Sequence, residues 1–240
     1  MKKQDVVILH GWNLSADRFT PLHKEFTRRG YHVMSLDFPG FGKEPAPRVP
    51  WHVSDYAEFL RTYLARNNVQ KPLLIGHSFG GRVALEFARR YPTSASALIL
   101  TGTPGFSPAA KIKTAVFGFF AKTGNILFAI PPLSFFSIAA RRFLYRAAGS
   151  GEYLKAQGAM KETFKNVVRD DLVAAMKELS VPALLLWGER DRMVPLAVAR
   201  KMQAVIPGAT LAVIAEEGHG LPYNNPKVFA DRTEQFIKNL

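Results

Sequence analysis

Cysteine is absent from the sequence, and its absence excludes several kinds of site. None of the 240 residues is a cysteine, so disulfide bridges, thiolate zinc sites and cysteine nucleophiles are all ruled out. Covalent catalysis in this chain would need another nucleophile. We find no motif that calls for a metal or an organic cofactor and expect neither.

Long uninterrupted apolar runs are also missing. The most apolar stretch, residues 114–140, is divided into short pieces by Gly118, residues 122–125 and Pro131, whereas a membrane-spanning helix needs about 20 consecutive apolar residues. The first apolar run, residues 6–9, is too short for a signal peptide. We therefore predict a cytoplasmic protein.

Negative charge is scarce, with 19 acidic residues against 32 lysines and arginines and a net charge of +13. Eleven of the basic residues, against four acids, lie between Pro104 and Lys177. A nucleic-acid partner has to be considered for so basic a chain. Because the charge is concentrated in one segment and no recognition motif accompanies it, we expect no nucleic-acid binding.

The apolar pattern predicts an α/β fold. Short runs rich in β-branched residues, bounded by Gly, Pro and Asp, are typical of buried parallel strands. Helical patterns lie between several of them, one with Ser54 as its candidate N-cap and one directly after Ser78, which implies βαβ crossovers. We predict a mostly parallel sheet of about six strands with helices on both faces. The predicted strands are residues 6–9, 32–36, 73–75, 97–100, 183–187 and 211–214.

The alternation of strands and helices stops between about residues 104 and 179. Helical patterns continue there without a convincing strand, which indicates an insertion that leaves the sheet and returns to it. A length of 240 residues suits one α/β domain. We predict a single domain over residues 1–240 with a helical insertion at about 104–179.

The strongest local motif is Gly-x-Ser-x-Gly around Ser78, directly after a predicted strand and directly before a predicted helix. A serine in that sharp turn has strained backbone geometry, and the flanking glycines let the helix and strand approach closely. The free amides at the helix start favour developing negative charge. We predict that Ser78 is a nucleophile; the alternative is a serine N-cap in a glycine-rich turn.

A serine hydroxyl needs a base, and a base needs a carboxylate that orients it. Of the six histidines, His219 lies just beyond the last predicted strand, where such folds place catalytic groups, and His77 is expected to point elsewhere. Asp191 follows another predicted strand and gives the order serine, acid, histidine. Glu189 and Asp37 are rival acids, and His219 and Asp191 could instead be ordinary loop residues.

Acyl transfer also requires donors for the oxyanion of the tetrahedral intermediate. Two backbone N–H groups suit this role, that of Phe79, directly after Ser78, and that of Trp12, in the turn after the first predicted strand. The alternative for the His10-Gly11 pair before Trp12 is a simple tight turn.

Five motifs in this order make the chain resemble the α/β-hydrolase superfamily along nearly its whole length. The resemblance implies a Ser-His-Asp hydrolase, carboxylesterase-like, with a helical cap. Two departures are the missing counterparts of the family's first two strands and Lys43, where small polar residues are common. Ser78 in place of an aspartate argues against the dehalogenase and epoxide-hydrolase branches. The motifs are Leu9-His10-Gly11-Trp12, Asp37-Phe38-Pro39-Gly40-Phe41-Gly42, residues 76–81, residues 188–195 and Gly218-His219.

The expected cap is rich in phenylalanine. Phe106, Phe117 and Phe120 are our candidates for an apolar substrate pocket, although apolar residues at helical spacing also build ordinary cores. The basic residues of the cap could be a solvated helix face. If both features act together, an amphiphilic acidic substrate or weak contact with an anionic membrane surface is the corresponding hypothesis.

The sequence favours hydrolysis of a small-molecule carboxylic ester through an acyl-serine intermediate. A carbon–carbon bond hydrolase or lyase that uses the same triad is the second hypothesis. A ligand-binding receptor with slow turnover is the third. The sequence leaves the natural substrate and the oligomeric state open.

Overall fold

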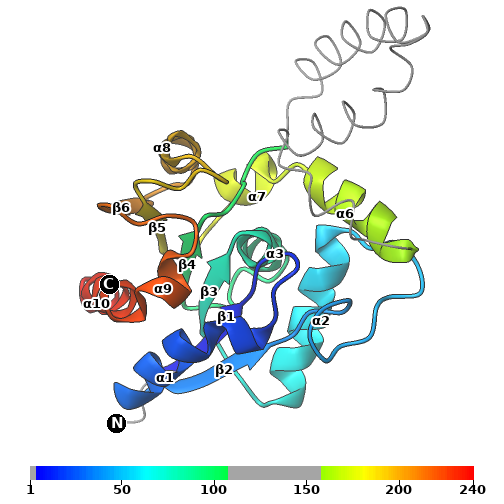
Figure 1. The fold of residues 1–240 in the computed structure, drawn as a ribbon, viewed down its shortest axis with the longest axis horizontal. Helices are drawn as coiled ribbons and strands as arrows, with labels where there is room; N and C mark the ends of the chain where they lie inside the picture. The colour runs from blue at the N-terminus through cyan, green and yellow to red at the C-terminus, as the bar shows by residue number, and fades with distance from the viewer. Residues whose placement is uncertain (1–3, 108–157) are drawn as a thin grey trace, which may run out of the picture.

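The computed structural model describes residues 4–107 and 158–240. Six parallel strands form one sheet in the order β2-β1-β3-β4-β5-β6, so the predicted fold class is confirmed (Figure 1). Each predicted strand is present and differs by two residues at most from the expected bounds. The strands are β1 (Asp5–Leu9), β2 (His32–Leu36), β3 (Leu73–His77), β4 (Ala97–Thr101), β5 (Ala183–Gly188) and β6 (Thr210–Ile214).

Helices cover both faces of this sheet. The helices of one face pack on Val7, Leu9 and Leu74, and those of the other on Val6 and Ile8, because successive side chains of a strand point to opposite faces. The first group is α2 (Val53–Arg66), α3 (Phe79–Arg90), α6 (Ala159–Arg169), α7 (Val173–Lys177) and α8 (Leu196–Val205); the second is η1 (Ala16–Phe19), α1 (Thr20–Arg28), α9 (Leu221–Asn224) and α10 (Pro226–Lys238).

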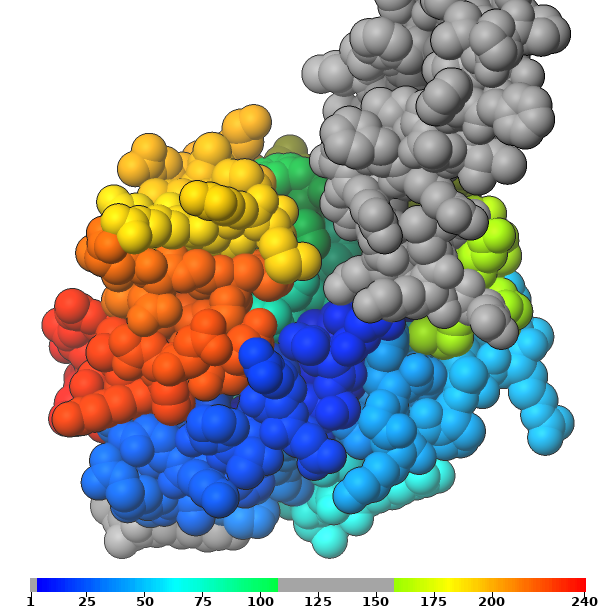
Figure 2. All heavy atoms as spheres, viewed as in Figure 1, coloured from blue at the N-terminus to red at the C-terminus, as the bar shows by residue number. Residues whose placement is uncertain are grey.

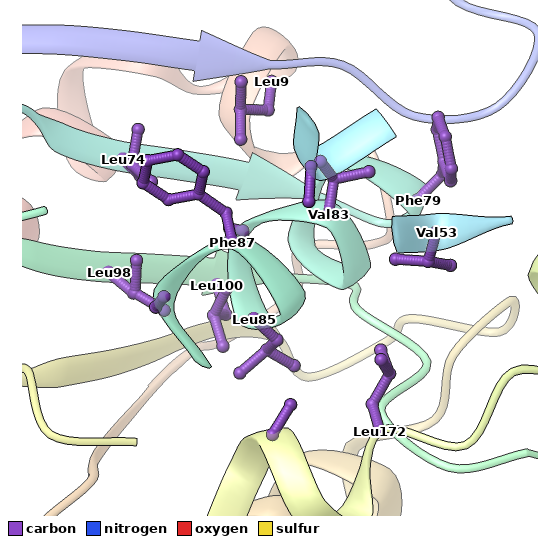
Figure 3. Close-up of a cluster of buried hydrophobic side chains, with 14 of the residues drawn as sticks. Leu9, Val53, Leu74, Phe79, Val83, Leu85, Phe87, Leu98, Leu100 and Leu172 are labelled. Carbon is purple, nitrogen blue, oxygen red and sulfur yellow. The ribbon is translucent and has the colours of Figure 1, made fainter. Parts of the chain in front are cut away.

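The larger core lies between the sheet and α3. Figure 3 shows Val83 and Phe87 on α3, with the Phe87 ring directed toward Leu74 of β3. Every residue of α3 from Phe79 to Ala88 is buried, and at about 25 cal/mol per Å² of apolar area such a helix contributes strongly to stability. The Gly-x-Ser-x-Gly motif therefore leads directly into a deeply buried helix.

One helix start differs from the sequence prediction, which placed the N-cap of α2 at Ser54. The helix begins at Val53, and His52 occupies the N-cap position. The Val53 N–H donates to Oδ2 of Asp170, 2.8 Å away and far along the chain. The His52 N–H also donates to Oδ2 of Asp55 at 2.7 Å, so a local contact and a tertiary one together cap this helix start.

The C-terminal helix and the first α-helix pack together on one side of the molecule. The C-terminal helix α10 packs against α1, and Arg29 bonds Glu234 at 2.9 Å across them. On the face seen in Figure 2, the orange-to-red C-terminal segments border the blue N-terminal ones. The segments that follow β1 and β6 also meet on this side, where the ring centroids of Phe19 in η1 and Tyr223 in α9 lie 5.5 Å apart.

The predicted insertion is described only at its edges. Residues 158–179 form helices α6 and α7, as the sequence pattern indicated, while residues 108–157 lie outside the described residues. The prediction of a single domain over residues 1–240 stays a prediction. In the described part of the chain, no helix combines the length and the hydropathy needed to cross a membrane.

Candidate active site

Ser78 occupies the sharp turn between β3 and α3. Its backbone has φ 52° and ψ −112°, a conformation that residues other than glycine adopt only under strain. Its N–H donates to the carbonyl of Thr101 at 2.9 Å. A Cβ on Gly80 would collide with the carbonyl oxygen of Leu9, so glycine there lets α3 approach β1. The turn holds a partly exposed Ser78 at the carboxyl edge of the sheet.

Asp191 and His219 meet at the same edge, from the loops that follow β5 and β6. Nδ1 of His219 lies 2.8 Å from Oδ2 of Asp191, whose side chain is 1% exposed. The other oxygen, Oδ1, accepts the N–H groups of Met193 and Val194 at 2.9 and 2.8 Å. A carboxylate with these partners favours the proton on Nδ1 of His219, which leaves Nε2 as a proton acceptor.

The end of β4 lies beside both His219 and Ser78. Gly102 directly follows β4, and a Cβ on it would lie 2.6 Å from Cε1 of His219 and 3.3 Å from Oδ2 of Asp191. The preceding residue, Thr101, accepts the backbone N–H of Ser78. The backbone of Ser78 and the imidazole of His219 therefore lie beside two consecutive residues, Thr101 at the end of β4 and Gly102 after it.

The two predicted oxyanion residues are neighbours. The ring centroids of Trp12 and Phe79 lie 5.4 Å apart, and the N–H of Phe79 is the first of α3, so it has no acceptor within the helix. His10 stabilises the loop after β1, which contains Trp12. Its Nδ1 donates to the Gly11 carbonyl at 2.8 Å, and its Nε2 accepts the N–H of Phe38 at 2.9 Å. Burial lowers the pKa of His10, so the ring is neutral and can do both.

The side chain of His77 contacts the loop that carries His219, a partner that the sequence did not indicate. It is buried, its ring centroid lies 4.6 Å from that of His219, and its Nε2 is 3.0 Å from the carbonyl oxygen of His219. Burial lowers the pKa of His77 to about 3, so the neutral ring donates from Nε2 to that carbonyl. His77 thus connects the nucleophile turn to the loop that carries His219.

Two rival acids have other partners. The carboxylate of Asp37 accepts the N–H of Ala16 at 2.7 Å and that of Lys43 at 2.9 Å, and so joins the loops after β1 and β2. Glu189 is exposed, and Oε2 accepts the N–H of Glu216 at 3.4 Å. Of the three carboxylates considered, Asp191 is the one that bonds His219.

The predicted substrate-binding phenylalanines are mostly untested. Phe106 is half-buried and packs against the larger core, while Phe117 and Phe120 lie outside the described residues. Near Trp12 the structure instead places Phe41, at 4.8 Å between ring centroids, and Phe164 of α6, at 5.1 Å. The apolar i, i+4 spacing of Met160 and Phe164 in α6 was the signal that could have indicated this face.

A metal site has no support in the part of the chain that the structure describes. No three His, Asp or Glu side chains of residues 4–107 and 158–240 come close enough together to bind an ion. The chemistry available at this edge of the sheet is that of a hydroxyl, an imidazole, a carboxylate and backbone amides.

Comparison with known proteins gives one family. The sequence profile described as alpha/beta hydrolase fold matches residues 6–226. Among curated proteins, the uncharacterized hydrolase YugF of Bacillus subtilis is 26% identical over 252 residues, which cover 98% of this chain and 90% of YugF. A 2-hydroxy-6-oxononadienedioate/2-hydroxy-6-oxononatrienedioate hydrolase of Paraburkholderia phymatum is also 26% identical, over 98% of this chain and 87% of its own.

The solved structures agree on the fold. The esterase EaEST from Exiguobacterium antarcticum superposes with a TM-score of 0.75 at 22% identity, over 99% of this chain and 92% of the esterase. A bromoperoxidase from Bacillus anthracis superposes with a TM-score of 0.73, also at 22% identity, over 98% of this chain and 92% of its own. At such identities the likeness is one of architecture, with the loops free to differ.

Proposed function

Because the chain belongs to the α/β-hydrolase fold family, we propose that it is a serine hydrolase that cleaves carboxylic esters of small or acyl-chain-bearing apolar molecules. The observation that carries the proposal is the 2.8 Å bond between Nδ1 of His219 and Oδ2 of Asp191, beside a strained Ser78. A hydrolase of this fold acts on a small-molecule substrate.

In the first half of the reaction, Oγ of Ser78 attacks the ester carbonyl carbon and its proton passes to Nε2 of His219. Asp191 stabilises the imidazolium that forms. The N–H groups of Trp12 and Phe79 donate to the oxyanion, and the intermediate collapses as the alcohol leaves with the proton from His219. The product is an acyl-serine.

In the second half, His219 takes a proton from water, whose oxygen attacks the acyl carbon. Collapse of this second intermediate returns the proton to Oγ of Ser78 and releases the carboxylic acid. The tautomer favoured by Asp191 suits both halves, because each begins with a free lone pair on Nε2.

The direct test is labelling of the intact protein with a fluorophosphonate probe. We expect rapid covalent labelling of the wild type, none of Ser78→Ala, and slow labelling of His219→Gln, because the serine without its base is a poor nucleophile. Ester turnover by Ser78→Ala should fall by about four orders of magnitude or more. Equal labelling of the wild type and Ser78→Ala would disprove the assignment, and an unlabelled wild type would favour the slow-turnover receptor.

Carbon–carbon bond hydrolysis is a second candidate, favoured by the relative from Paraburkholderia phymatum, whose name gives a 2-hydroxy-6-oxo dienedioate as substrate. The same three residues could serve it. Product analysis on an ester panel beside a panel of 2-hydroxy-6-oxo dienoates and other diketones separates the two. Turnover of the diketones alone, lost in Ser78→Ala, would replace the ester proposal.

A further inference from the structure

Arg82 is a buried cation that the proposed mechanism does not use. It lies in the first turn of α3, four residues after Ser78, and is 3% exposed. Burial lowers the pKa of Arg82 to about 10, so the guanidinium still carries its charge at neutral pH. Because an unpaired buried charge is strongly unfavourable, what this side chain binds needs an explanation.

The guanidinium bonds the backbone at two places in the predicted insertion, at its start and after α6. Nη1 donates to the carbonyl of Pro104, on the segment that leaves β4, and Nη2 donates to the carbonyl of Asp170, 2.5 Å away at the end of α6. The Nε atom has no partner among residues 4–107 and 158–240. The fork of an arginine can hold two carbonyls at once, which the single ammonium of a lysine does less well.

Asp170 connects the same point to α2. Its carboxylate lies 2.9 Å from Nδ1 of His52 and accepts the N–H of Val53. Farther along α6, Oγ1 of Thr163 accepts the N–H of Trp51 at 2.9 Å. Helix α6 is therefore tied to the start of α2 along one side and to the nucleophile helix through Arg82.

Two further side chains of α6 reach the loops after β1 and β2. The ring of Phe164 packs 5.1 Å from that of Trp12, and a Cβ on Gly40 would lie 2.5 Å from Sδ of Met160. Since Trp12 also contacts Phe79, a row of packed apolar side chains, with Trp12 and Phe79 buried, runs from the residue after Ser78 through Trp12 to α6. An acyl chain whose carbonyl accepts from the Trp12 and Phe79 amides would begin beside this row.

We propose that Arg82 is a positioning residue that fixes α6 against the nucleophile helix and thereby determines how well the site accepts long apolar acyl chains. This inference rests on the proposed ester hydrolysis for its substrate and on the two carbonyl contacts for its geometry. Arg82 touches no reacting atom, and its effect passes through the positions of Phe164 and Met160.

The test compares Arg82→Met, which removes both donated bonds, with Arg82→Lys, which keeps the charge and one donor. The matched control is Arg89→Met on the same helix, where the arginine pairs with Glu86 of its own helix. Turnover of p-nitrophenyl octanoate and acetate is measured for each, per active site titrated with the fluorophosphonate.

We expect the ratio of octanoate to acetate kcat/KM to fall about tenfold in Arg82→Met, mainly through KM for octanoate, as the loss of a charge-assisted hydrogen bond would give. Arg82→Lys should lie between it and the wild type, and Arg89→Met should match the wild type. A purely structural role would lower the titrated fraction and leave the ratio unchanged, which would overturn the proposal.

Hydrogen exchange separates this inference from the proposed function. In Arg82→Met the amides of α6 should exchange faster while those of α10 keep their protection, whether or not the protein cleaves esters. If the exchange rates of α6 were unchanged in both Arg82 variants, the bonds from Arg82 to Pro104 and Asp170 would not determine the position of this helix. A wild type that cleaves neither ester would instead count against the ester proposal.

Discussion

Asp37 and Asp191 both follow a strand at the same edge of the sheet, but their carboxylates have different partners. Both oxygens of Asp37 accept backbone N–H groups, from Ala16 and Lys43. Asp191 uses one oxygen for two backbone N–H groups and the other for the imidazole of His219. The first carboxylate organises loops, whereas the second couples a loop to a group that can exchange a proton.

The histidines after two neighbouring strands differ in the same way. His10, after β1, bonds the Gly11 carbonyl and the Phe38 amide, so both its nitrogens serve nearby backbone. His77, at the end of β3, donates to the carbonyl of His219, and its Nδ1 has no partner within the described part of the chain. His10 thus holds nearby backbone through both nitrogens, whereas His77 holds the loop that carries His219 through one.

The largest expected effect comes from Asp191→Asn. The carboxamide would donate to Nδ1 of His219 and force the proton onto Nε2, so we expect kcat to fall by about four orders of magnitude. The amides of Met193 and Val194 keep their acceptor, so the thermal unfolding midpoint should change little. Steady-state kinetics and calorimetry measure both.

Asp37→Asn is the matched control on the other side. It replaces one carboxylate oxygen of Asp37 by an NH₂ group that faces a backbone N–H. We therefore expect a stability loss of about 1–3 kcal/mol and a much smaller loss of kcat than in Asp191→Asn. If Asp37→Asn reduced kcat as severely as Asp191→Asn, the distinction between the two carboxylates would be wrong.

A second, smaller effect is expected from His77→Phe. The carbonyl of His219 loses its donor, so we expect kcat to fall by about 10- to 100-fold through misplacement of the base, with KM nearly unchanged. His77→Gln, which can still donate an N–H, should recover part of the loss.

His10→Phe provides the comparison for that variant. It leaves both the Phe38 amide and the Gly11 carbonyl unpaired, so we expect a larger stability loss than in His77→Phe, of about 2–4 kcal/mol. Denaturant unfolding of the two variants tests the order. If His77→Gln recovered no kcat, and His77→Phe and His10→Phe lost equal stability, the difference assigned to His77 and His10 would be wrong.

The smallest effect concerns pH. The pKa of His77 lies near 3 in the folded chain against an ordinary value of 6.5, so below pH 6.5 the unfolded chain binds a proton that the folded chain does not. Stability should therefore decline on acidification from pH 6.5 toward 3, by up to about 1.4 kcal/mol per pH unit for this group. Urea unfolding between pH 7 and 4.5 should show that stability declines less steeply on acidification in His77→Phe than in the wild type. An identical decline in the two proteins would contradict this prediction.

How far the sequence predicted the site depends on the residue. Ser78 could be placed at a strand-to-helix turn because the Gly-x-Ser-x-Gly motif acts within six residues. The role of His77 could not be predicted, since its partner is a carbonyl 142 residues away. The bond from the Val53 N–H to Asp170 at the start of α2 could not be predicted for the same reason, because the two residues lie 117 positions apart.

The sequence by itself determined the sheet and the turn at Ser78, because strand periodicity and close glycine packing act between residues near one another in the chain. Only the tertiary structure decided that Asp191, rather than Asp37 or Glu189, bonds His219, and that Arg82 joins Pro104 to Asp170. These contacts depend on where loops meet after the sheet has formed, and hydrogen bonds carry no sequence pattern across such distances.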